Sequence, residues 1–560
     1  MSITFNKKQQ QVINELNQNI LLSAGAGTGK TNVLSYRVAN ILNKNRANAD
    51  EILCLTFTNK ACRELKNRIT SQLDFDKITI RTIHGFAYQV ITTTAKKVQT
   101  IFKEFVIFDD EDQKTLIRQT IANFPKARAL DIQYIVNCIE QLKQERALKH
   151  IYTEDIEADY TTIYHQHLKF NKTFNQQQND NLTKFFQFNG LNIIINYELA
   201  LQQMHGLDYK DLIANAYRLF QDENICSSWR KRYKYIMIDE MQDTSSFEYT
   251  MLENLFSANN IMLCGDEFQT IYEWRGSNPQ KILTAFTEKY NPLIINFNEN
   301  YRSTKLLLEM AYNTLINLFC KETILHSYAK NLLSKSSELG HKIELKQANS
   351  LANEAQWIFQ NIVNLLPLVK TPTQIAILVR QNNYLQNLTL HLNYLANIYN
   401  QKNQEEPIHF IQIDNIRFFK RQAIKDVLSI MKYLINPNDY LSLQRILINL
   451  IPNIGIRTIK QISSAEYLQN GLRLSDFINA NFQNPNYKPF SDLISAYLSK
   501  DIIVFDIEGT GTDIFADNII QLSAIKIRKG KKIAEFNRYL KSDKPVGDSE
   551  KVHHISNEYL

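Results

Sequence analysis

One stretch, residues 24–31 with the sequence Ala-Gly-Ala-Gly-Thr-Gly-Lys-Thr, constrains the fold of this chain more than any other. The apolar run at residues 20–22 precedes it, and apolar residues at helical spacing follow it from Val33 to Leu42. A strand, a glycine-rich loop and a helix in this order are typical of a phosphate-binding loop. Glycines lack a Cβ, so the backbone N–H groups of such a loop can turn towards phosphate oxygens. The sequence therefore predicts an α/β fold that binds a nucleotide.

Within this loop, Lys30 would reach the β- and γ-phosphates and the Thr31 hydroxyl would ligate Mg²⁺. Ala24 stands where the usual pattern has its first glycine. A dinucleotide-binding pattern fails because Lys30 occupies the place of its third glycine. The alternative is a glycine-rich turn without a ligand. We expect ATP with Mg²⁺, and the loop residues expected to contact it are Ala24, Gly25, Ala26, Gly27, Thr28, Gly29, Lys30 and Thr31.

Length and charge set limits on what else the chain can be. Its 560 residues are too many for one core, so we expect several domains. A hydrophobic content of 44% with 22% charged residues is typical of globular proteins. Lys and Arg number 64 against 57 Asp and Glu, and this excess of 7 permits nucleic-acid binding without demonstrating it.

The cysteines and the apolar runs indicate a cellular location. The six cysteines are scattered without a C-x-x-C pair, which argues against a metal cluster or a disulfide framework. No apolar run reaches membrane-spanning length, and residues 1–8 lack the apolar core of a signal peptide. We therefore expect a soluble cytoplasmic protein without a membrane partner.

Five further motifs follow the phosphate loop in order. They are Thr-Phe-Thr-Asn-Lys at 56–60, Thr-Ile-His-Gly-Phe at 82–86, Ile-Met-Ile-Asp-Glu-Met-Gln-Asp-Thr at 236–244, the segment 265–276, and Asn-Tyr-Arg-Ser-Thr at 300–304. Together with the loop they resemble superfamily 1 DNA helicases of the UvrD/Rep type. That resemblance implies an α/β architecture of two RecA-like P-loop NTPase lobes with parallel sheets and helical insertions, and ATP between the lobes.

Two adjacent carboxylates would act on ATP. Asp239 and Glu240 end an apolar β-like run, so both would emerge at the carboxyl edge of a sheet, where open α/β sheets bind ligands. Asp239 would hold Mg²⁺, directly or through water. Glu240 would orient and deprotonate the attacking water.

Four more residues complete the expected ATP site. Gln269 would sense the γ-phosphate, and Arg302 would stabilise the charge that develops during phosphoryl transfer. An isolated arginine is more often a surface ion-pair residue, but the surrounding motif favours the catalytic role for Arg302. By resemblance, Gln9 would read the adenine edge and Tyr301 would stack on the adenine ring.

Single-stranded DNA binding needs contacts to the backbone and flat side chains that stack on bases. Any single aromatic residue is more often part of a core than a stacking platform, and Trp274 is the strongest candidate because it lies before a turn. We interpret His84 as a hydrogen-bonding loop residue because no metal-ligand partner stands at a suitable spacing. The expected DNA contacts are Thr56, Phe57, Asn59, Thr82, His84, Phe86, Tyr272, Trp274 and Arg275.

The remaining segments divide the chain into domains. An acidic run from Asp109 is expected to begin a helix, and residues 375–380 are expected to form a strand. Arg417, Lys420 and Arg421 would contact duplex phosphates or form a solvated helix face. The expected domains are 1–90 and 207–290 for the first lobe, 91–206 for its helical insertion, 291–385 for an incomplete second lobe, 386–500 for the second insertion, and 501–560 for a further domain.

Residues 501–560 resemble the start of a DnaQ-like exonuclease, which implies a partial RNase H-like hairpin. Asp506 and Glu508 lie two apart on an expected strand, so both would point to one face and could share metal ions. Two further aspartates and a general base normally complete such a site. A hairpin with surface acids is the alternative.

Two late family segments, Thr-x-His-x-x-Lys-Gly-Leu-Glu and Tyr-Val-Ala-x-Thr-Arg-Ala, have no counterpart after Ile454. We therefore expect that this chain is the front part of a longer one, or that a partner chain supplies the missing motifs. The expected function is ATP-driven translocation on, and unwinding of, DNA in repair or recombination, with 3′→5′ polarity implied by resemblance. Single-stranded and junction DNA are the expected partners. The alternatives are a DNA-binding module without turnover, and a nuclease to which the helicase part delivers DNA.

Overall fold

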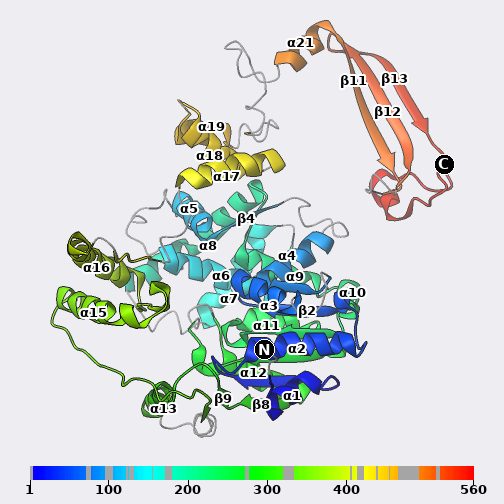
Figure 1. Ribbon diagram of the computed structural model, residues 1–560. Coiled ribbons are helices and arrows are strands. Elements are labelled where there is room, and N and C mark those ends of the chain that lie inside the picture. Colours follow the sequence, from blue (N-terminus) through cyan, green and yellow to red (C-terminus); the bar gives the residue numbers. More distant parts are fainter. Residues whose placement is uncertain are drawn as a thin grey trace. The chain divides into compact units, whose positions relative to one another are not determined.

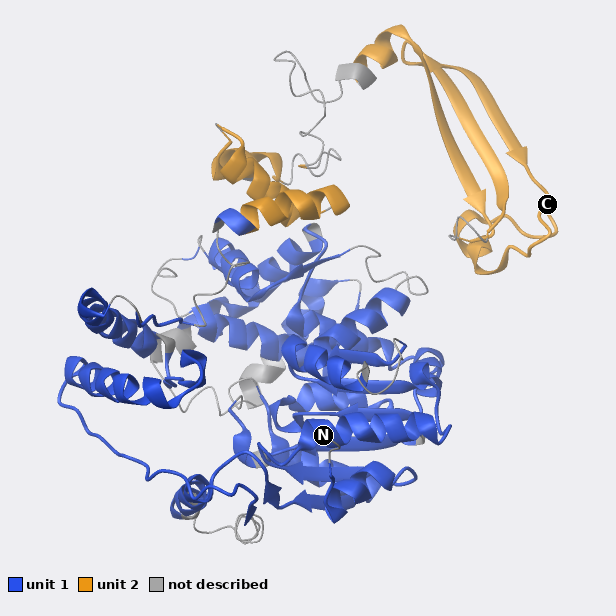
Figure 2. Cartoon of the chain, in the orientation of Figure 1, with its two compact units in different colours: residues 1–424 blue, residues 425–560 orange. Residues whose placement is uncertain are grey.

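The computed structural model divides the chain into two compact units, residues 1–424 and 425–560 (Figure 2). Each unit is described by itself below, with elements labelled as in Figure 1. The structure describes residues 4–70, 77–94, 105–121, 124, 132–153, 155–170, 180–271, 276–319, 333–403, 407–412, 422–436, 439–452, 454–464, 474, 491–511 and 517–560.

A six-stranded sheet lies at the centre of the first unit. Its strand order is β3-β2-β6-β7-β1-β8, and every neighbouring pair is parallel. Since all the strands run the same way, their carboxyl ends meet at one edge of the sheet. The strands are β1 (Ile20–Ala24), β2 (Ile52–Thr56), β3 (Thr79–Thr82), β6 (Tyr235–Ile238), β7 (Asn260–Gly265) and β8 (Leu293–Phe297).

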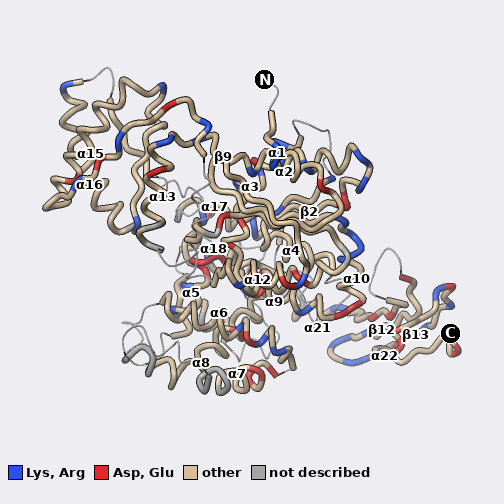
Figure 3. The backbone as a smooth tube through the Cα atoms, turned by 90° about the horizontal axis from the view of Figure 1, so that it is seen from below, with Lys and Arg blue, Asp and Glu red and all other residues tan. Residues whose placement is uncertain are grey.

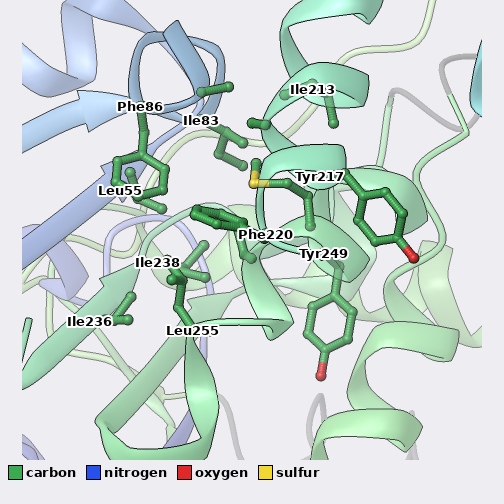
Figure 4. Close-up of a cluster of buried hydrophobic side chains, with 14 of the residues drawn as sticks. Leu55, Ile83, Phe86, Ile213, Tyr217, Phe220, Ile236, Ile238, Tyr249 and Leu255 are labelled. Atoms are coloured by element: carbon green, nitrogen blue, oxygen red, sulfur yellow. The ribbon is translucent and has the colours of Figure 1, made fainter. Parts of the chain in front are cut away.

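Helices cover both faces of this sheet, because successive strand residues point to opposite sides. Leu53, Leu55 and Ile238 belong to the core on one face, part of which Figure 4 shows. The helices on that face are α4 (Ile83–Thr94), α9 (Tyr209–Leu219), α10 (Glu223–Arg232), α11 (Ser246–Glu253) and α12 (Pro279–Tyr290).

The opposite face packs against the helices that begin near the N-terminus. In β2, Ile52 and Cys54 alternate with Leu53 and Leu55, and they belong to a second core on this face. Val33 and Val38 of one covering helix are fully buried there. The helices are α1 (Lys7–Asn14), α2 (Lys30–Asn43) and α3 (Asn59–Thr70), all drawn in blue in Figure 1. The expected strand, loop and helix around residues 24–31 are therefore present as β1, the loop and α2.

A helical insertion interrupts the first unit after α4. The short strands β4 (Val106–Phe108) and β5 (Gly206–Asp208) pair in parallel at its two ends. Asp109 begins its first helix as expected, since the Oδ1 atom of Asp109 accepts N–H groups from Glu111 and Asp112 at 2.9 Å each. Its helices are α5 (Asp110–Ile121), α6 (Ile132–Leu148), α7 (Ile156–Phe170) and α8 (Asp180–Gln203).

The segment from β8 to residue 424 forms few strands. β9 (Glu299–Asn300) pairs with β10 (Leu333–Ser334), and the helices α13 (Lys305–Phe319), α15 (Leu351–Leu365) and α16 (Asn382–Lys402) follow. The strand expected at residues 375–380 is wrong: these described residues join no sheet, and Leu378 is 92% exposed. A strand needs a hydrogen-bonded neighbour, and this segment has none among the described residues. Arg417, Lys420 and Arg421 lie outside the described residues.

The second unit joins short helices to an antiparallel sheet. The helices are α17 (Gln422–Ile435), which begins just before this unit, α18 (Tyr440–Leu450), α19 (Ile456–Ile462), α21 (Ser491–Ser499) and α22 (Glu550–His553). The sheet has the order β11-β12-β13, with β11 (Asp501–Gly509), β12 (Ile519–Arg528) and β13 (Lys531–Tyr539). The expected pair of strands is thus present, and a third strand extends it.

Short 3₁₀ helices connect several of these elements. They are η1 (Ala49–Glu51), η5 (Met241–Asp243), η6 (Phe256–Ala258), η7 (Glu267–Gln269), η9 (Leu366–Leu368), η10 (Pro372–Gln374) and η14 (Gly547–Ser549).

Figure 3 shows Lys and Arg interleaved with Asp and Glu along the chain. Among the described helices, none has the length and apolar character that a bilayer crossing requires.

A buried ionic cluster joins the helical insertion to α9. Lys143 of α6 is 2% exposed, and its Nζ lies 2.8 Å from Glu198 and 2.7 Å from both Asp208 and Asp211. Asp208 and Asp211 cap the start of α9, so one ammonium group connects the insertion to a helix of the main core. The buried Glu198 and Asp208 and the partly buried Asp211 all lie within 2.8 Å of this one ammonium group.

We predict that Lys143→Met lowers the free energy of unfolding by about 3–5 kcal/mol, because it leaves buried carboxylates without their counter-charge. Urea unfolding followed by circular dichroism measures the change. The matched control is Lys149→Met, which removes an exposed ion pair between the residue that follows α6 and Glu145 of α6, and should cost less than about 0.5 kcal/mol. Equal stability of Lys143→Met and the wild type would contradict the role of the cluster.

Candidate functional site

The loop after β1 has the geometry of a phosphate cradle. Gly27 and Gly29 adopt φ angles of 81° and 85°, a region that favours glycine. The Thr28 hydroxyl donates to the Gly25 carbonyl at 2.7 Å and closes the turn. The loop leads directly into α2, so its backbone N–H groups lie at the positive end of a helix.

Lys30 lies beside both carboxylates that follow β6. Its Nζ is 2.6 Å from Glu240 Oε2 and 3.6 Å from Asp239 Oδ1. β1 and β6 are not adjacent in the sheet, but the strand order places both ends on the same edge. The structure therefore brings together the three residues that the sequence assigned to phosphate, metal and water.

The backbone at Glu240 is strained. Glu240 has a φ of 54°, in the left-handed region that non-glycine residues seldom adopt. Its N–H donates to Asp239 Oδ1 at 3.0 Å, and the Asp239 N–H donates to the Leu55 carbonyl at 2.8 Å. This bend turns the Glu240 carboxylate towards Lys30 as soon as the strand ends.

Charge and burial act together on these groups. Burial disfavours the charged form of Lys30, but Asp239 and Glu240 outweigh burial and raise the pKa of the ammonium group. Burial alone would raise the pKa of the Glu240 carboxyl group, but the charge of Lys30 outweighs burial and lowers that pKa. Burial and the nearby Glu240 raise the pKa of Asp243 to about 6. Lys30 and Glu240 are thus held as an ion pair.

The motif at 300–304 contacts the phosphate loop through its backbone and Asn300. Asn300 Nδ2 donates to the Ala26 carbonyl at 2.8 Å, and the Tyr301 N–H donates to the Gly27 carbonyl at 2.8 Å. A Cβ on Gly27 would lie 2.7 Å from the Cβ of Arg302, so only glycine fits there. The Arg302 side chain therefore begins next to the phosphate loop, and it is exposed.

A polar group near the N-terminus adjoins Tyr301. Gln9 is buried, its Nε2 donates to the Thr28 carbonyl at 3.0 Å, and its Oε1 accepts the Asn6 N–H. Asn6 donates to both the Tyr301 hydroxyl and Glu299. Gln9 and Tyr301 thus lie on the same side of the phosphate loop, as a shared base-binding site would need.

Residues after β2 and β3 divide into exposed and buried groups. Asn59 is exposed, and Phe57, Thr82 and His84 are partly exposed; Thr82 Oγ1 accepts the Gly85 N–H at 3.0 Å. His84 Nδ1 lies 3.6 Å from Glu248 Oε1. These four side chains are accessible at the carboxyl edge of the sheet.

Phe86 and Thr56 require a correction. Phe86 is fully buried and packs edge-to-face against Trp229 and Tyr233, and Thr56 is 1% exposed. Neither side chain can reach DNA in this conformation, so the expectation that they contact it is wrong here. Phe86 lies on the face of α4 that points into the core of Figure 4. Tyr272, Trp274 and Arg275 lie outside the described residues.

Sequence reasoning missed two residues that link the parts of this site, Gln242 and Asn300. Gln242 Nε2 donates to Glu240 Oε2 at 2.8 Å, and Gln242 Oε1 accepts the Asp266 N–H at 3.0 Å. Gln269 Nε2 donates to Asp266 Oδ2 at 2.7 Å. Both missed residues belong to motifs that the sequence analysis had quoted. Each is a polar residue close to the end of a strand, and that position could have indicated a role in the site.

Family comparison decides between the nucleotide-binding folds that this geometry allows. A family model described as the UvrD/REP helicase N-terminal domain matches residues 5–291, about half of the chain, and a UvrD-like helicase C-terminal domain matches residues 295–557. The chain belongs to the UvrD/REP helicase family. The second match runs through residues 501–557.

Individual members of the UvrD/REP family extend the comparison. A probable DNA helicase II homolog of Mycoplasma capricolum subsp. capricolum is 30% identical over 483 residues, 84% of this chain and 60% of the relative. The ATP-dependent DNA helicases PcrA of Staphylococcus aureus and Staphylococcus epidermidis are 26% and 27% identical, each over 93% of this chain and 66% of the relative. The chain thus spans 60% to 66% of the length of these relatives.

The second unit presents Asp506 and Glu508 on one face of its sheet. Asp506 lies opposite Ser523 and Glu508 opposite Gln521 in the register of β11 and β12. Ser523 and Gln521 both donate to Asn537 Oδ1, at 3.1 Å and 2.9 Å. This end of the face is polar. The other face carries apolar residues of the same strands, among them Phe505 and Phe536.

Proposed function

We propose that this chain is an ATP-driven DNA translocase and helicase. The observation that carries the proposal is the convergence of Lys30, Asp239 and Glu240 at the carboxyl edge of the parallel sheet, directly beside a phosphate cradle. Membership of the UvrD/REP family and the names of the relatives support DNA as the polymer on which it acts.

The residues at the cradle fit a nucleotide with a divalent cation. The left-handed glycines leave room for phosphate oxygens, and Thr31 lies in the first turn of α2, with Asp239 at the end of β6 on the same edge of the sheet. We assign Mg²⁺ to Thr31 and Asp239, since Mg²⁺ is usually held by one or two protein oxygens plus substrate phosphates. Mg²⁺ would neutralise phosphate charge during transfer.

Each side chain then has a defined task. Lys30 leaves Glu240 and binds the β- and γ-phosphates, which frees the Glu240 carboxylate to accept a proton from the attacking water. Gln269 contacts the γ-phosphate, and Arg302 approaches from the segment beside Gly27. Gln9 and Tyr301 hold the adenine.

DNA would bind along the same edge of the sheet. We assign contacts to Phe57, Asn59, Thr82 and His84, which are accessible there. By resemblance, we also assign contacts to Tyr272, Trp274 and Arg275. The 3′→5′ polarity rests on resemblance alone. The domain boundaries given above and the supply of the late family motifs by a further polypeptide segment also remain predictions.

We predict opposite defects for two substitutions at the cradle. Lys30→Ala should weaken ATP binding at least tenfold, because the phosphates lose their buried cation. Glu240→Gln should keep ATP affinity but lower turnover about 10²- to 10⁴-fold, as expected for loss of a general base. Binding of a fluorescent ATP analogue and phosphate release measure the two effects. Unchanged turnover in either variant would refute the assignment of the site.

An ATP- and DNA-binding module without turnover is the competing interpretation. It predicts that the wild-type chain binds ATP and single-stranded DNA, and that neither single-stranded nor junction DNA raises phosphate release above the Lys30→Ala level. Strand separation of a duplex with a 3′ single-stranded tail would exclude this interpretation.

We propose a second function, phosphodiester hydrolysis, for the β11-β12-β13 unit. Supporting it is the common face on which Asp506 and Glu508 lie, in the antiparallel order expected for the start of an exonuclease-like sheet. If these two carboxylates hold a metal ion, Mn²⁺ titration followed by electron paramagnetic resonance should detect a site that is lost in Asp506→Ala and kept in Asp543→Ala. Identical titrations for the wild type and Asp506→Ala would reject the proposal.

A further inference from the structure

Gln242 lies between the two halves of the ATP site. It follows Glu240 by two residues, in η5, and is 2% exposed. Its side-chain amide uses both ends: Nε2 donates to Glu240 Oε2 at 2.8 Å, and Oε1 accepts the backbone N–H of Asp266 at 3.0 Å. It therefore joins the end of β6 to the end of β7.

The chemistry of these two neighbours restricts what can stand at this position. A carboxylate only accepts hydrogen bonds, and a backbone N–H only donates. A group that bridges them must therefore donate at one end and accept at the other, as an amide does. Glutamate at this position would lose the donor and repel Glu240, and methionine would lose both bonds.

The packing around Gln242 leaves little room for another arrangement. A Cβ on Gly265 would lie 2.4 Å from Gln242 Oε1 and 3.2 Å from the backbone nitrogen of Met241. Gly265 is fully part of β7, so the strand end and the amide are in close contact. A buried amide held in this way has one orientation available.

The connection continues beyond Asp266. Asp266 Oδ1 accepts the Phe268 N–H at 3.1 Å, and Asp266 Oδ2 accepts Gln269 Nε2 at 2.7 Å. Hydrogen bonds thus run without a break from Lys30 through Glu240, Gln242 and Asp266 to Gln269. Gln269 precedes residues 272–275, the segment assigned to DNA.

We propose that Gln242 is a positioning residue that holds Glu240 in place relative to the turn from Asp266 to Gln269. Its side-chain amide would thereby fix the position of the general base, Glu240, relative to Gln269, which contacts the γ-phosphate. This inference rests on the proposed ATPase function. We further infer that DNA bound to the residues after this turn would move the turn. Gln242 would transmit that movement to the Glu240 carboxylate.

Steady-state ATP hydrolysis by the full chain, with and without single-stranded DNA, tests the inference in three variants. Gln242→Glu keeps the size and the acceptor but loses the donor, and Gln242→Met loses both. Gln221→Glu is the control, because it makes the same chemical change at an exposed glutamine that donates to the Tyr217 carbonyl outside the site.

We expect Gln242→Glu and Gln242→Met to lower kcat about 10- to 100-fold, the range seen when a residue that orients a reacting group is removed. The KM for ATP should stay within about threefold, since phosphate binding by Lys30 is untouched. DNA stimulation should fall in both variants, and Gln221→Glu should behave as wild type.

Three results would overturn the inference. The first is wild-type kcat in Gln242→Glu. The second is a parallel loss of kcat, ATP affinity and melting temperature in both variants, which indicates a purely structural role. The third is a fall in kcat with DNA stimulation unchanged, which removes the link to the turn. If the wild-type chain shows no turnover above Lys30→Ala, the proposed function itself fails, and the inference fails with it.

Discussion

Parallel pairing of the strands is the constraint on which the rest of this structure depends. Six strands that all run the same way deliver their carboxyl ends to one edge, and the residues that follow those ends include Lys30, Asp239 and Asp266. Lys30 and Asp266 are far from Glu240 in the sequence, yet hydrogen bonds link all three at that edge, with Gln242 bridging Glu240 and Asp266. The two apolar cores hold this edge in place because the four inner strands, β2, β6, β7 and β1, contribute alternate residues to both faces.

One ammonium group lies between two carboxylates at this edge. The buried ammonium of Lys30 pairs with Glu240, and the same carboxylate oxygen accepts the Gln242 amide. In the proposed function, nucleotide binding exchanges the contact between Lys30 and Glu240 for contacts between Lys30 and phosphate oxygens. The strained φ of Glu240 keeps its carboxylate at the point where that exchange occurs.

Local patterns predicted the parts of the site that are local in sequence. The loop at residues 24–31 and the Asp-Glu pair each follow a short apolar strand, so their placement followed from neighbouring residues. Phe86 was assigned to DNA although Ile83, Phe86 and Val90 share one helical face, which is the spacing of a core helix. The resemblance of the motif at 82–86 to the helicase family led to the assignment of Phe86 to DNA. The helical spacing of the apolar residues predicted burial, and Phe86 is buried.

Features that depend on distant partners could not be predicted in the same way. Gln242 acquires its role from Asp266, 24 residues away, and the sequence gives no sign that the two meet. Residues 375–380 have the composition of a strand, but a strand forms only beside another, and that neighbour is not encoded locally. The cluster around Lys143 likewise joins residues from three helices.

Phosphate release from ATP, with and without single-stranded DNA and with Lys30→Ala as the blank, tests the central claim most directly. The claim is that the edge of the sheet is one site at which DNA controls hydrolysis. It predicts turnover that depends on Lys30 and rises when DNA is added. ATP binding without any Lys30-dependent turnover, in the presence or absence of DNA, would contradict it.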